Sequence, residues 1–280
     1  MTESVITFSF GENWQKFLDR TIDETQIEHA CERTRKFLQL DSLRGLTFID
    51  IGCGSGLFSY VAHRLGAARI ISFDVDPRSV DCCRRMKELA GSPEGWEIHH
   101  GSILDSDFVR GLPAADVVYS WGVLHHTGNM WQAIRNAASL VRPGGRFAIA
   151  IYNKVEYRTL KAWRGSYGWL RLKRTYNRGG PIVKRAMEVG LASKHIAGMI
   201  LRLRNPLSEM RAYSSKRGMN WWRDHIDWLG GYPYEFATTG ELFTFCHQQA
   251  GLRLEGLTSA TSTGCHELLF RAPSAAPSEK

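Results

Sequence analysis

The stretch that decides the fold is Phe48-Ile-Asp-Ile-Gly-Cys-Gly-Ser-Gly56, in which an apolar strand runs directly into a glycine-rich turn. Glycines at positions 52, 54 and 56 let the backbone approach a ligand closely, because they carry no Cβ atom. A segment with helical periodicity follows from Leu57, and the start of a helix offers free N–H groups to a ligand. Together these features predict a nucleotide-binding site at the end of a buried strand.

Strands and helices alternate outward from this turn. We expect strands at 46–51, 69–75, 96–103, 116–121 and 146–152, with helices over 57–65, 79–90 and 130–141. A capping box at Thr25-Gln-Ile-Glu28 predicts a further helix, ending near Gly45, before the first strand. This alternation is typical of a parallel sheet with helices on both faces.

The C-terminal part adds two strands of a different kind. Thr239 is expected to cap a helix over 241–250, and strands follow at 252–259 and 265–272. The connection at 260–264 is too short for a crossover helix, so the last strand should run antiparallel to its predecessor. The predicted fold is an α/β, Rossmann-like sheet of seven strands with an antiparallel last strand. It has an N-terminal helical segment and a helical lid insertion after the fifth strand.

This organisation divides the chain into four parts. Residues 1–45 form an N-terminal helical cover, and residues 46–152 and 238–272 together form the ligand-binding core. The core is interrupted by a basic, aromatic insertion at 153–237. Residues 273–280 are expected to be a disordered tail.

Composition restricts the function further. The 280 residues contain no apolar run long enough for a membrane span and no basic-then-apolar leader at the N-terminus. Six cysteines occur without a CxxC pair, which argues against a zinc site or a disulfide framework, and no other metal site is indicated. A cytoplasmic location is therefore expected.

Positive charge is concentrated in one segment. The net charge is +8, but residues 152–217 hold 16 Lys and Arg against three acids, which is +13 for that segment. This asymmetry suits a phosphate-bearing substrate, a nucleic acid or an anionic membrane, and a solvated helical face is the alternative.

The spacing of the glycines separates two classes of nucleotide. A dinucleotide site requires GxGxxG, whereas this chain has GxGxG preceded by Asp50, which would repel a pyrophosphate but suits a cationic amino group. Asp74 lies 18 residues after Gly56, at the end of the second strand, where a carboxylate can accept two ribose hydroxyls.

Three motifs carry a family resemblance: Asp50-Ile-Gly-Cys-Gly-Ser-Gly56, Phe73-Asp-Val-Asp-Pro77 and Arg142-Pro-Gly-Gly145. They closely resemble those of the class I S-adenosylmethionine-dependent methyltransferases, over residues 46–152 and 238–272. The resemblance implies S-adenosylmethionine as cofactor. It places the cofactor's methionine moiety beside the glycine turn (Gly52, Cys53, Gly54 and Gly56), the ribose at Asp74 and the adenine against Val75.

Two further cofactor contacts depart from the family pattern. An Asp often follows the third strand in this family, but the stretch here is Gly101-Ser-Ile-Leu-Asp105. We expect Ser102 and Ile103 to contact the adenine, with Asp105 as the second choice. Trp121 is expected to line the cofactor pocket, where an aromatic face favours a cationic sulfonium.

The acceptor side is indicated by Ser120-Trp-Gly-Val-Leu-His-His-Thr127. This segment resembles that of small-molecule methyltransferases related to ubiquinone and menaquinone biosynthesis. The Pro-Pro turn of base-modifying enzymes and the Pro-Cys of cytosine C5 enzymes are both absent, so DNA is an unlikely target. His125 and His126 are the expected general bases, because imidazole titrates near ~6.5.

The leading prediction is therefore O-methylation of a small metabolite, which is anionic, lipid-linked or part of a glycan. N- or C-methylation is an alternative, and so is a non-catalytic protein that binds a membrane or nucleic acid through the basic insertion. Peripheral contact with an anionic membrane is compatible with either, and the sequence does not indicate an oligomeric state. The expected substrate contacts are Trp14, Tyr152, His225, Tyr232 and Tyr234.

Overall fold

The computed structural model describes residues 24–157, 165–217 and 221–274. Its centre is a seven-stranded sheet in the order β3-β2-β1-β4-β5-β7-β6. Strands β1 to β5 are parallel, β7 runs antiparallel to β5, and β6 runs antiparallel to β7. The predicted Rossmann-like sheet of seven strands, with its antiparallel last strand, is confirmed. The strands are β1 (Thr47–Ile51), β2 (Arg69–Asp74), β3 (Trp96–His100), β4 (Ala115–Trp121), β5 (Val141–Tyr152), β6 (Arg253–Thr258) and β7 (Cys265–Arg271).

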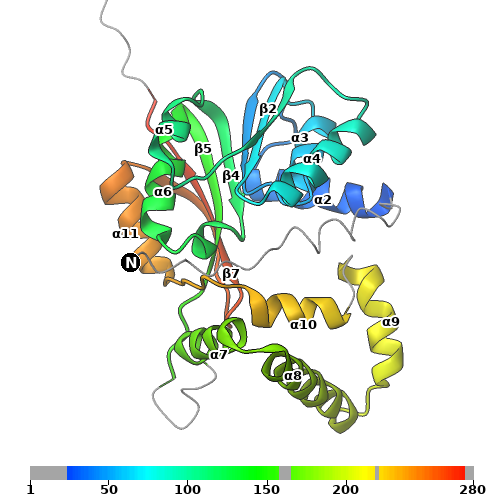
Figure 1. Ribbon diagram of the computed structural model, residues 1–280. Coiled ribbons are helices and arrows are strands. Elements are labelled where there is room, and N and C mark those ends of the chain that lie inside the picture. The colour runs from blue at the N-terminus through cyan, green and yellow to red at the C-terminus, as the bar shows by residue number, and fades with distance from the viewer. Residues whose placement is uncertain (1–23, 158–164, 218–220, 275–280) are drawn as a thin grey trace, which may run out of the picture.

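Helices cover both faces of this sheet (Figure 1). One face carries α2 (Glu24–Leu38), α3 (Leu57–Arg64) and α4 (Pro77–Leu89). The other carries α5 (Ser106–Arg110), α6 (Met130–Ser139) and α11 (Thr239–Ala250), and a short 3-10 helix η1 (Leu124–His126) follows β4. Successive side chains of β1 point to opposite faces of the sheet. Phe48 therefore packs in the core beneath α2 and α3, and Ile49 packs in the core beneath α6 and α11.

Several boundaries differ from the predicted ones for local reasons. The first helix ends at Leu38 rather than near Gly45, because Gln39 adopts a left-handed φ of 52°. The cap of α11 is Thr238 rather than Thr239, since only Thr238 has a glutamate three residues later, Glu241, to complete the capping box. The short helix α5 was not predicted at all.

The motif Arg142-Pro-Gly-Gly145 precedes the strand predicted at 146–152, but in the structure it turns within β5. Val141 pairs with Ala115 and Arg146 pairs with Val117, so the four residues between them face Asp116 alone. The turn is thus a bulge in the strand, and an ion pair from Arg142 to Asp116 closes it.

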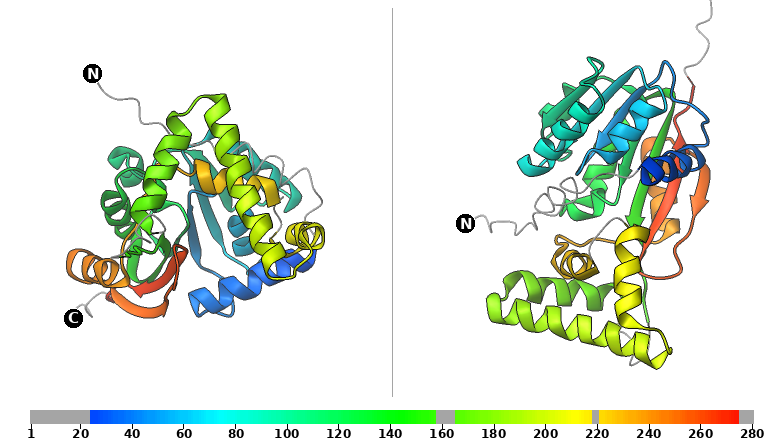
Figure 2. Two further views of the ribbon diagram at one scale, coloured as in Figure 1. Left: turned by 90° about the horizontal axis from the view of Figure 1, so that it is seen from below. Right: turned by 90° about the vertical axis from the view of Figure 1, so that its right-hand side faces the viewer.

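Between β5 and α11 the described residues, 153–157, 165–217 and 221–238, form four helices: α7 (Ser166–Arg178), α8 (Pro181–Leu201), α9 (Pro206–Arg217) and α10 (Trp221–Gly230). They gather beyond the carboxyl ends of the parallel strands, as the views in Figures 1 and 2 show. The insertion leaves and rejoins the core at one place, where the N–H of Ala237 bonds Tyr152 O at 3.0 Å and the N–H of Lys154 bonds Ala237 O at 3.0 Å. Among the described helices, none has the length and hydropathy needed to cross a bilayer.

Candidate active site

The glycine turn requires glycine for both conformation and space. Gly52, Gly54 and Gly56 have φ values of 71°, 53° and 81°, in the left-handed region that L side chains rarely adopt. A Cβ on Gly56 would lie 2.9 Å from the Cα of Cys83 in α4, and a Cβ on Gly52 would lie 2.4 Å from Cγ1 of Val123. The turn is therefore packed between α4 and the loop after β4, with no room for a side chain at Gly52 or Gly56.

Asp74 ends β2 beside this turn. Its Oδ2 accepts the N–H of Gly54 at 3.0 Å and its Oδ1 accepts the N–H of Asp76 at 2.9 Å. Burial raises the pKa of this carboxyl, and the backbone N–H groups of Asp76, Gly54 and Val75 oppose that shift. A carboxylate has about four lone-pair sites, so acceptor capacity remains for a ribose hydroxyl. Val75, the next residue, is 66% exposed and offers an apolar surface for a base.

Asp50 differs from the expectation that it faces a cationic amino group. Strand alternation turns it toward α3, where it is 3% exposed and accepts the hydroxyl of Ser59 at 2.5 Å. Ser59 also bonds Ser72, which in turn accepts the indole N–H of Trp96 at 2.8 Å. These hydrogen bonds make the Asp50 carboxyl part of a buried polar network beneath the turn. Burial raises the pKa of this carboxyl to about 7.

The expected adenine contacts are only partly available. Ile103 is 5% exposed and packs in the α6/α11 core, so its side chain points away from any ligand. Ser102 is half-buried, with its hydroxyl accepting the N–H of Leu104 at 3.2 Å. Asp105 caps α5 by accepting the N–H groups of Asp107 and Phe108. Ser102 is thus the better placed of the predicted pair.

Cys53 and Trp121 also have partners that the sequence did not reveal. The Cys53 thiol is buried against Cys83, and the hydrogen bond between them, together with burial, raises its pKa well above the ordinary value. The indole N–H of Trp121 bonds Glu267 at 2.8 Å, and the ring lines a pocket beside α2. Trp121 is therefore part of that pocket's wall.

His125 lies just after β4 and is fully buried. Its Nδ1 accepts the N–H of Tyr152 at 3.3 Å, so in the neutral ring the proton is on Nε2. This Nε2 has no hydrogen-bond partner within the described part of the chain. Burial, and secondarily the charges of His126 and Lys173, hold the pKa of His125 well below its usual range.

His126 has the opposite tautomer. Its Nδ1 lies 2.6 Å from the carbonyl oxygen of Pro233 and must donate to it, so Nε2 holds the lone pair. The residue is half-buried. Burial lowers its pKa to about 4, the bond to Pro233 opposes this, and the charge of Lys173 adds to it. His126 is therefore a neutral hydrogen-bond acceptor at pH 7.

Aromatic side chains from the core and the insertion meet around this pair. The Tyr152 ring lies 4.0 Å from that of His125 and 5.1 Å from that of Tyr234, whose hydroxyl is buried. Lys173 of α7 is only 1% exposed, with its ammonium 4.9 Å from the Tyr234 ring and 5.1 Å from the Trp228 ring. The ammonium also donates to the carbonyl of Trp228.

Because Lys173 is buried, the basic segment 152–217 is not a single solvated face. Trp169, Lys173 and Tyr176 recur at helical spacing on the inner face of α7. That spacing was a readable signal, but the sequence gives a lysine no reason to be buried. The charged side chain therefore belongs to the interface between the insertion and the core.

The remaining predicted substrate contacts lie elsewhere. His225 is 6% exposed and bonds His195 of α8 and the carbonyl of Trp221, so it joins two helices of the insertion. Tyr232 is half-buried and precedes a cis proline, Pro233. Trp14 lies outside the described residues. Tyr152 and Tyr234 are thus the two that the structure brings beside the histidines.

Comparison with known proteins identifies the core. Residues 49–149 match the family described as "Methyltransferase domain". A ubiquinone biosynthesis O-methyltransferase of Parvibaculum lavamentivorans is 28% identical over 222 residues, covering 70% of this chain and 79% of that protein. One from a Methylobacterium species is 34% identical, but the match covers only 41% of this chain and 44% of that protein. A ribosomal protein L11 methyltransferase of Azotobacter vinelandii is 35% identical over 41% of this chain and 37% of that protein.

Solved structures agree on the fold. A magnesium protoporphyrin IX methyltransferase from Synechocystis, determined with bound S-adenosylhomocysteine, has a TM-score of 0.52 at 15% identity and covers 93% of each chain. An O-methyltransferase family protein from Burkholderia thailandensis has a TM-score of 0.53 at 17% identity, covering 89% of this chain and 58% of that one.

The chain is a class I S-adenosylmethionine-dependent methyltransferase, and S-adenosylmethionine is its cofactor. The left-handed glycine turn, the lone pairs left on Asp74 and the exposed side chain of Val75 fit that cofactor. The relatives are named for different acceptors, one for ubiquinone biosynthesis and another for ribosomal protein L11, so the shared core does not decide which atom is methylated.

Proposed function

We propose that this enzyme methylates a hydroxyl group of its small-molecule acceptor, with His126 as the general base. The observation that carries the proposal is the position of the histidine pair. Val123 contacts Gly52 of the glycine turn, and His125 and His126 follow it by two and three residues. The lone pair of His126 is therefore presented from the loop that packs on the cofactor turn.

S-adenosylmethionine, when bound, supplies a methyl group on a positively charged sulfur. Asp74 would hold the ribose, Ser102 and Val75 would face the adenine, and the glycine turn would accommodate the methionine moiety. As the bound cofactor gives up its methyl group to the acceptor oxygen, Nε2 of His126 would take the hydroxyl proton. His125 orients the loop through its bond to the N–H of Tyr152.

The low pKa of His126, about 4, indicates the kind of hydroxyl that suits this site. So weak a base is always unprotonated at pH 7, but it has a low proton affinity. It therefore matches an acidic hydroxyl, such as a phenol with a pKa of about 10, better than an ordinary alcohol.

The test is a comparison of the two histidine substitutions. His126→Ala should lower kcat by ~10²–10⁴ while the affinity for S-adenosylhomocysteine, measured by calorimetry, stays unchanged. His125→Ala should have a smaller effect on kcat, because its ring only orients the loop. Full activity in His126→Ala would remove it from the mechanism, and a product methylated at nitrogen or carbon would refute O-methylation.

A second observation favours contact with an anionic surface. Helix α8 exposes aliphatic side chains along one side, with Ile182 85%, Val189 45% and Ile200 57% exposed, and Leu201 at its end is 84% exposed. The segment 152–217 around it carries +13. Like charge disfavours pairing of two copies through this surface, whereas an anionic bilayer complements both its charge and its apolar stripe. We propose peripheral binding there, which would suit an anionic or lipid-linked acceptor.

Sedimentation with phosphatidylcholine vesicles, with or without phosphatidylserine, tests this contact. The native chain should bind only the vesicles that contain phosphatidylserine, and added salt should release it by screening. The double variant Ile182→Asp/Leu201→Asp should lose binding, whereas Leu89→Asp should keep it, because Leu89 is also exposed, at 67%, but lies on α4 outside the insertion. Equal binding by all three proteins would refute the assignment to α8.

A further inference from the structure

Residues 231–238 connect α10 to α11 outside any helix or strand. The part at 233–237, here called the strap, lies against the histidine loop, residues 124–130. A Cβ on Gly128 of that loop would lie 3.4 Å from Cγ of Pro233 in the strap, which is van der Waals contact. Because no helix or strand fixes the strap, its position depends on individual hydrogen bonds.

The strap determines the tautomer of His126. The carbonyl oxygen of Pro233 accepts the Nδ1–H of this ring at 2.6 Å. A neutral imidazole is protonated at only one nitrogen, and the hydrogen bond that one nitrogen makes decides which. The lone pair on Nε2 therefore depends on where the strap places the Pro233 carbonyl.

Glu235 joins the strap to the histidine loop on both sides of His126. Its backbone N–H donates to the carbonyl oxygen of His125 at 2.9 Å. Both oxygens of its carboxylate accept the N–H of Met130, each at 3.1 Å. The N–H of Gly128 is a further donor to this carboxylate. One residue thus holds the loop just before His126 and again at the start of α6.

The side-chain bonds of Glu235 are of a strong kind. Hydrogen bonds from backbone N–H groups to a carboxylate are roughly twice as strong as those between neutral groups, and the N-terminal end of α6 adds a favourable dipole. Glu235 is half-buried, and burial raises the pKa of its carboxyl. The N–H groups of Met130 and Gly128 oppose that shift, since they favour the charged form.

Both partners of this contact are fixed elsewhere as well. In the histidine loop, the hydroxyl of Thr127 donates to the carbonyl of Leu124 at 2.8 Å and accepts the N–H of Asn129 at 3.3 Å. At the end of the strap, the N–H of Ala237 donates to the carbonyl of Tyr152 at 3.0 Å. A change in the contact between the two segments is therefore transmitted to the histidine ring.

We infer that Glu235 is a positioning residue of the active site. By holding the strap against the histidine loop, it keeps the Pro233 carbonyl at Nδ1 of His126 and so selects the tautomer whose lone pair is on Nε2. The use of that lone pair in the reaction rests on the proposed function. A helix cap alone would stabilise α6 without any effect on the tautomer, and this difference can be measured.

Long-range ¹H–¹⁵N NMR of the histidine rings tests the role of Glu235 on the full chain with S-adenosylhomocysteine bound. The spectrum is recorded at pH 7, where His126 is neutral because its pKa is about 4, and signals that disappear in His126→Gln identify this ring. The native ring should be protonated at Nδ1 and unprotonated at Nε2. In Glu235→Leu the Nε2 resonance should shift toward the protonated position. In Glu235→Gln it should shift less, because the amide oxygen still accepts a hydrogen bond.

Glu241→Leu is the matched control, because Glu241 also caps a helix with its carboxylate, by accepting the N–H of Thr238 at the start of α11. It should lower the stability toward urea but leave the ring nitrogens of His126 unchanged. Calorimetry should show that each variant still binds S-adenosylhomocysteine, and if Glu235→Leu does not, Glu235→Gln decides the test.

Three results would overturn the role of Glu235. They are an unchanged His126 tautomer in a Glu235 variant that binds S-adenosylhomocysteine, an equal shift in Glu241→Leu, and a native ring protonated at Nε2. None of these readings depends on turnover. Full activity in His126→Ala would therefore contradict the proposed reaction alone, and a tautomer that shifts in Glu235→Leu would still support the positioning role.

Discussion

The glycine turn after β1 and the helical insertion after β5 lie at the same end of the sheet, but they are built in different ways. In the turn, backbone angles and close backbone approaches determine what each residue does, as the φ of 81° at Gly56 and its proximity to Cys83 illustrate. In the insertion, side chains from distant segments determine the arrangement, as when Lys173 of α7 meets Trp228 of α10. Local backbone constraints leave a sequence motif, and long-range side-chain contacts leave almost none.

The largest expected effect comes from adding one methyl group to the turn. Gly56→Ala incurs a left-handed backbone cost of roughly 1–2 kcal/mol and an overpacking cost of about 1–3 kcal/mol against α4. Gly45→Ala is the control, because Gly45 has a similar φ of 78° but open space around it, so only the backbone cost applies. Urea unfolding of both variants measures the difference. Equal destabilisation would show that the contact with α4 does not constrain the turn.

The next prediction compares the pH dependence of two buried groups. The folded-state pKa of Asp50 is raised to about 7, so the folded state binds more protons above pH 4 and this group's stabilisation is lost as pH rises toward 7. The pKa of His126 is lowered to about 4, so the unfolded state binds more protons below pH 6.5 and stability is lost as pH falls.

The two substitutions should therefore change the pH profile of stability in opposite directions. Relative to the native chain, Asp50→Asn should lose stability toward pH 4, and His126→Gln should gain stability toward pH 4. Each difference has a limiting slope of about 1.4 kcal/mol per pH unit. Unfolding curves at pH 4 to 8 provide the measurement. Parallel profiles for either variant would mean that its group titrates normally in the folded state.

A smaller effect is expected at the interface of the insertion. Lys173→Met keeps the length of the side chain but leaves the carbonyl of Trp228 without this donor, which costs about 1–3 kcal/mol. It also removes a positive charge that lowers the pKa of both histidines, so the acidic limb of the kcat/KM profile should move to higher pH.

Arg174→Met is the matched control, because Arg174 neighbours Lys173 on α7 but is exposed. It should change neither stability nor the pH profile. If both variants behave like the native enzyme, the buried lysine does not couple the insertion to the histidines.

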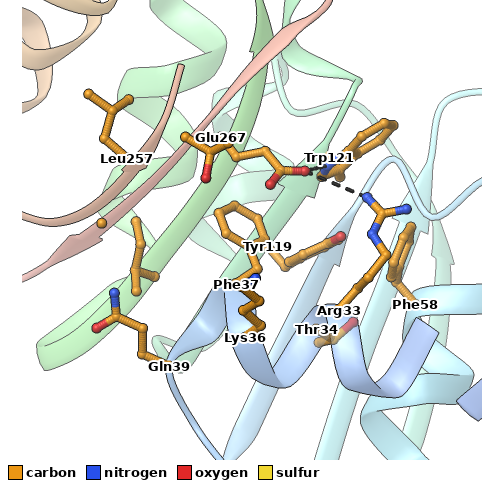
Figure 3. A pocket seen from close by; sticks show the side chains of 13 residues that line it. Arg33, Thr34, Lys36, Phe37, Gln39, Phe58, Tyr119, Trp121, Leu257 and Glu267 are labelled. Carbon is orange, nitrogen blue, oxygen red and sulfur yellow. Dashed lines mark hydrogen bonds and ion pairs between the residues drawn. The ribbon is translucent and has the colours of Figure 1, made fainter. Parts of the chain in front are cut away.

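The sequence predicted the seven strands, their order in the chain and the antiparallel end, because periodicity, glycine turns and connection lengths are local signals. Asp50 shows where such signals stop. The motif correctly predicts that Asp50 lies on the strand before the glycine turn. Whether its carboxylate faces a ligand or Ser59 depends on which face of β1 packs beneath α3. The cavity of about 410 Å³ beside α2 (Figure 3) is also absent from the sequence motifs, because Ala148 and Ala150 lie between larger side chains only in register with β4 and β7. Helix α8 escaped prediction because only Ala192 is buried along it.

The two backbone hydrogen bonds that join Tyr152 and Lys154 to Ala237 give the insertion a modular character. Because its two ends are fixed side by side, the segment between them can change in length or sequence without displacing β5 or α11. A short hairpin in place of residues 155–236 would leave the seven-stranded sheet and the glycine turn covalently continuous. Exchange of this segment between related enzymes is thus a route to new acceptors, in evolution and in protein engineering, that keeps the donor half of the enzyme intact.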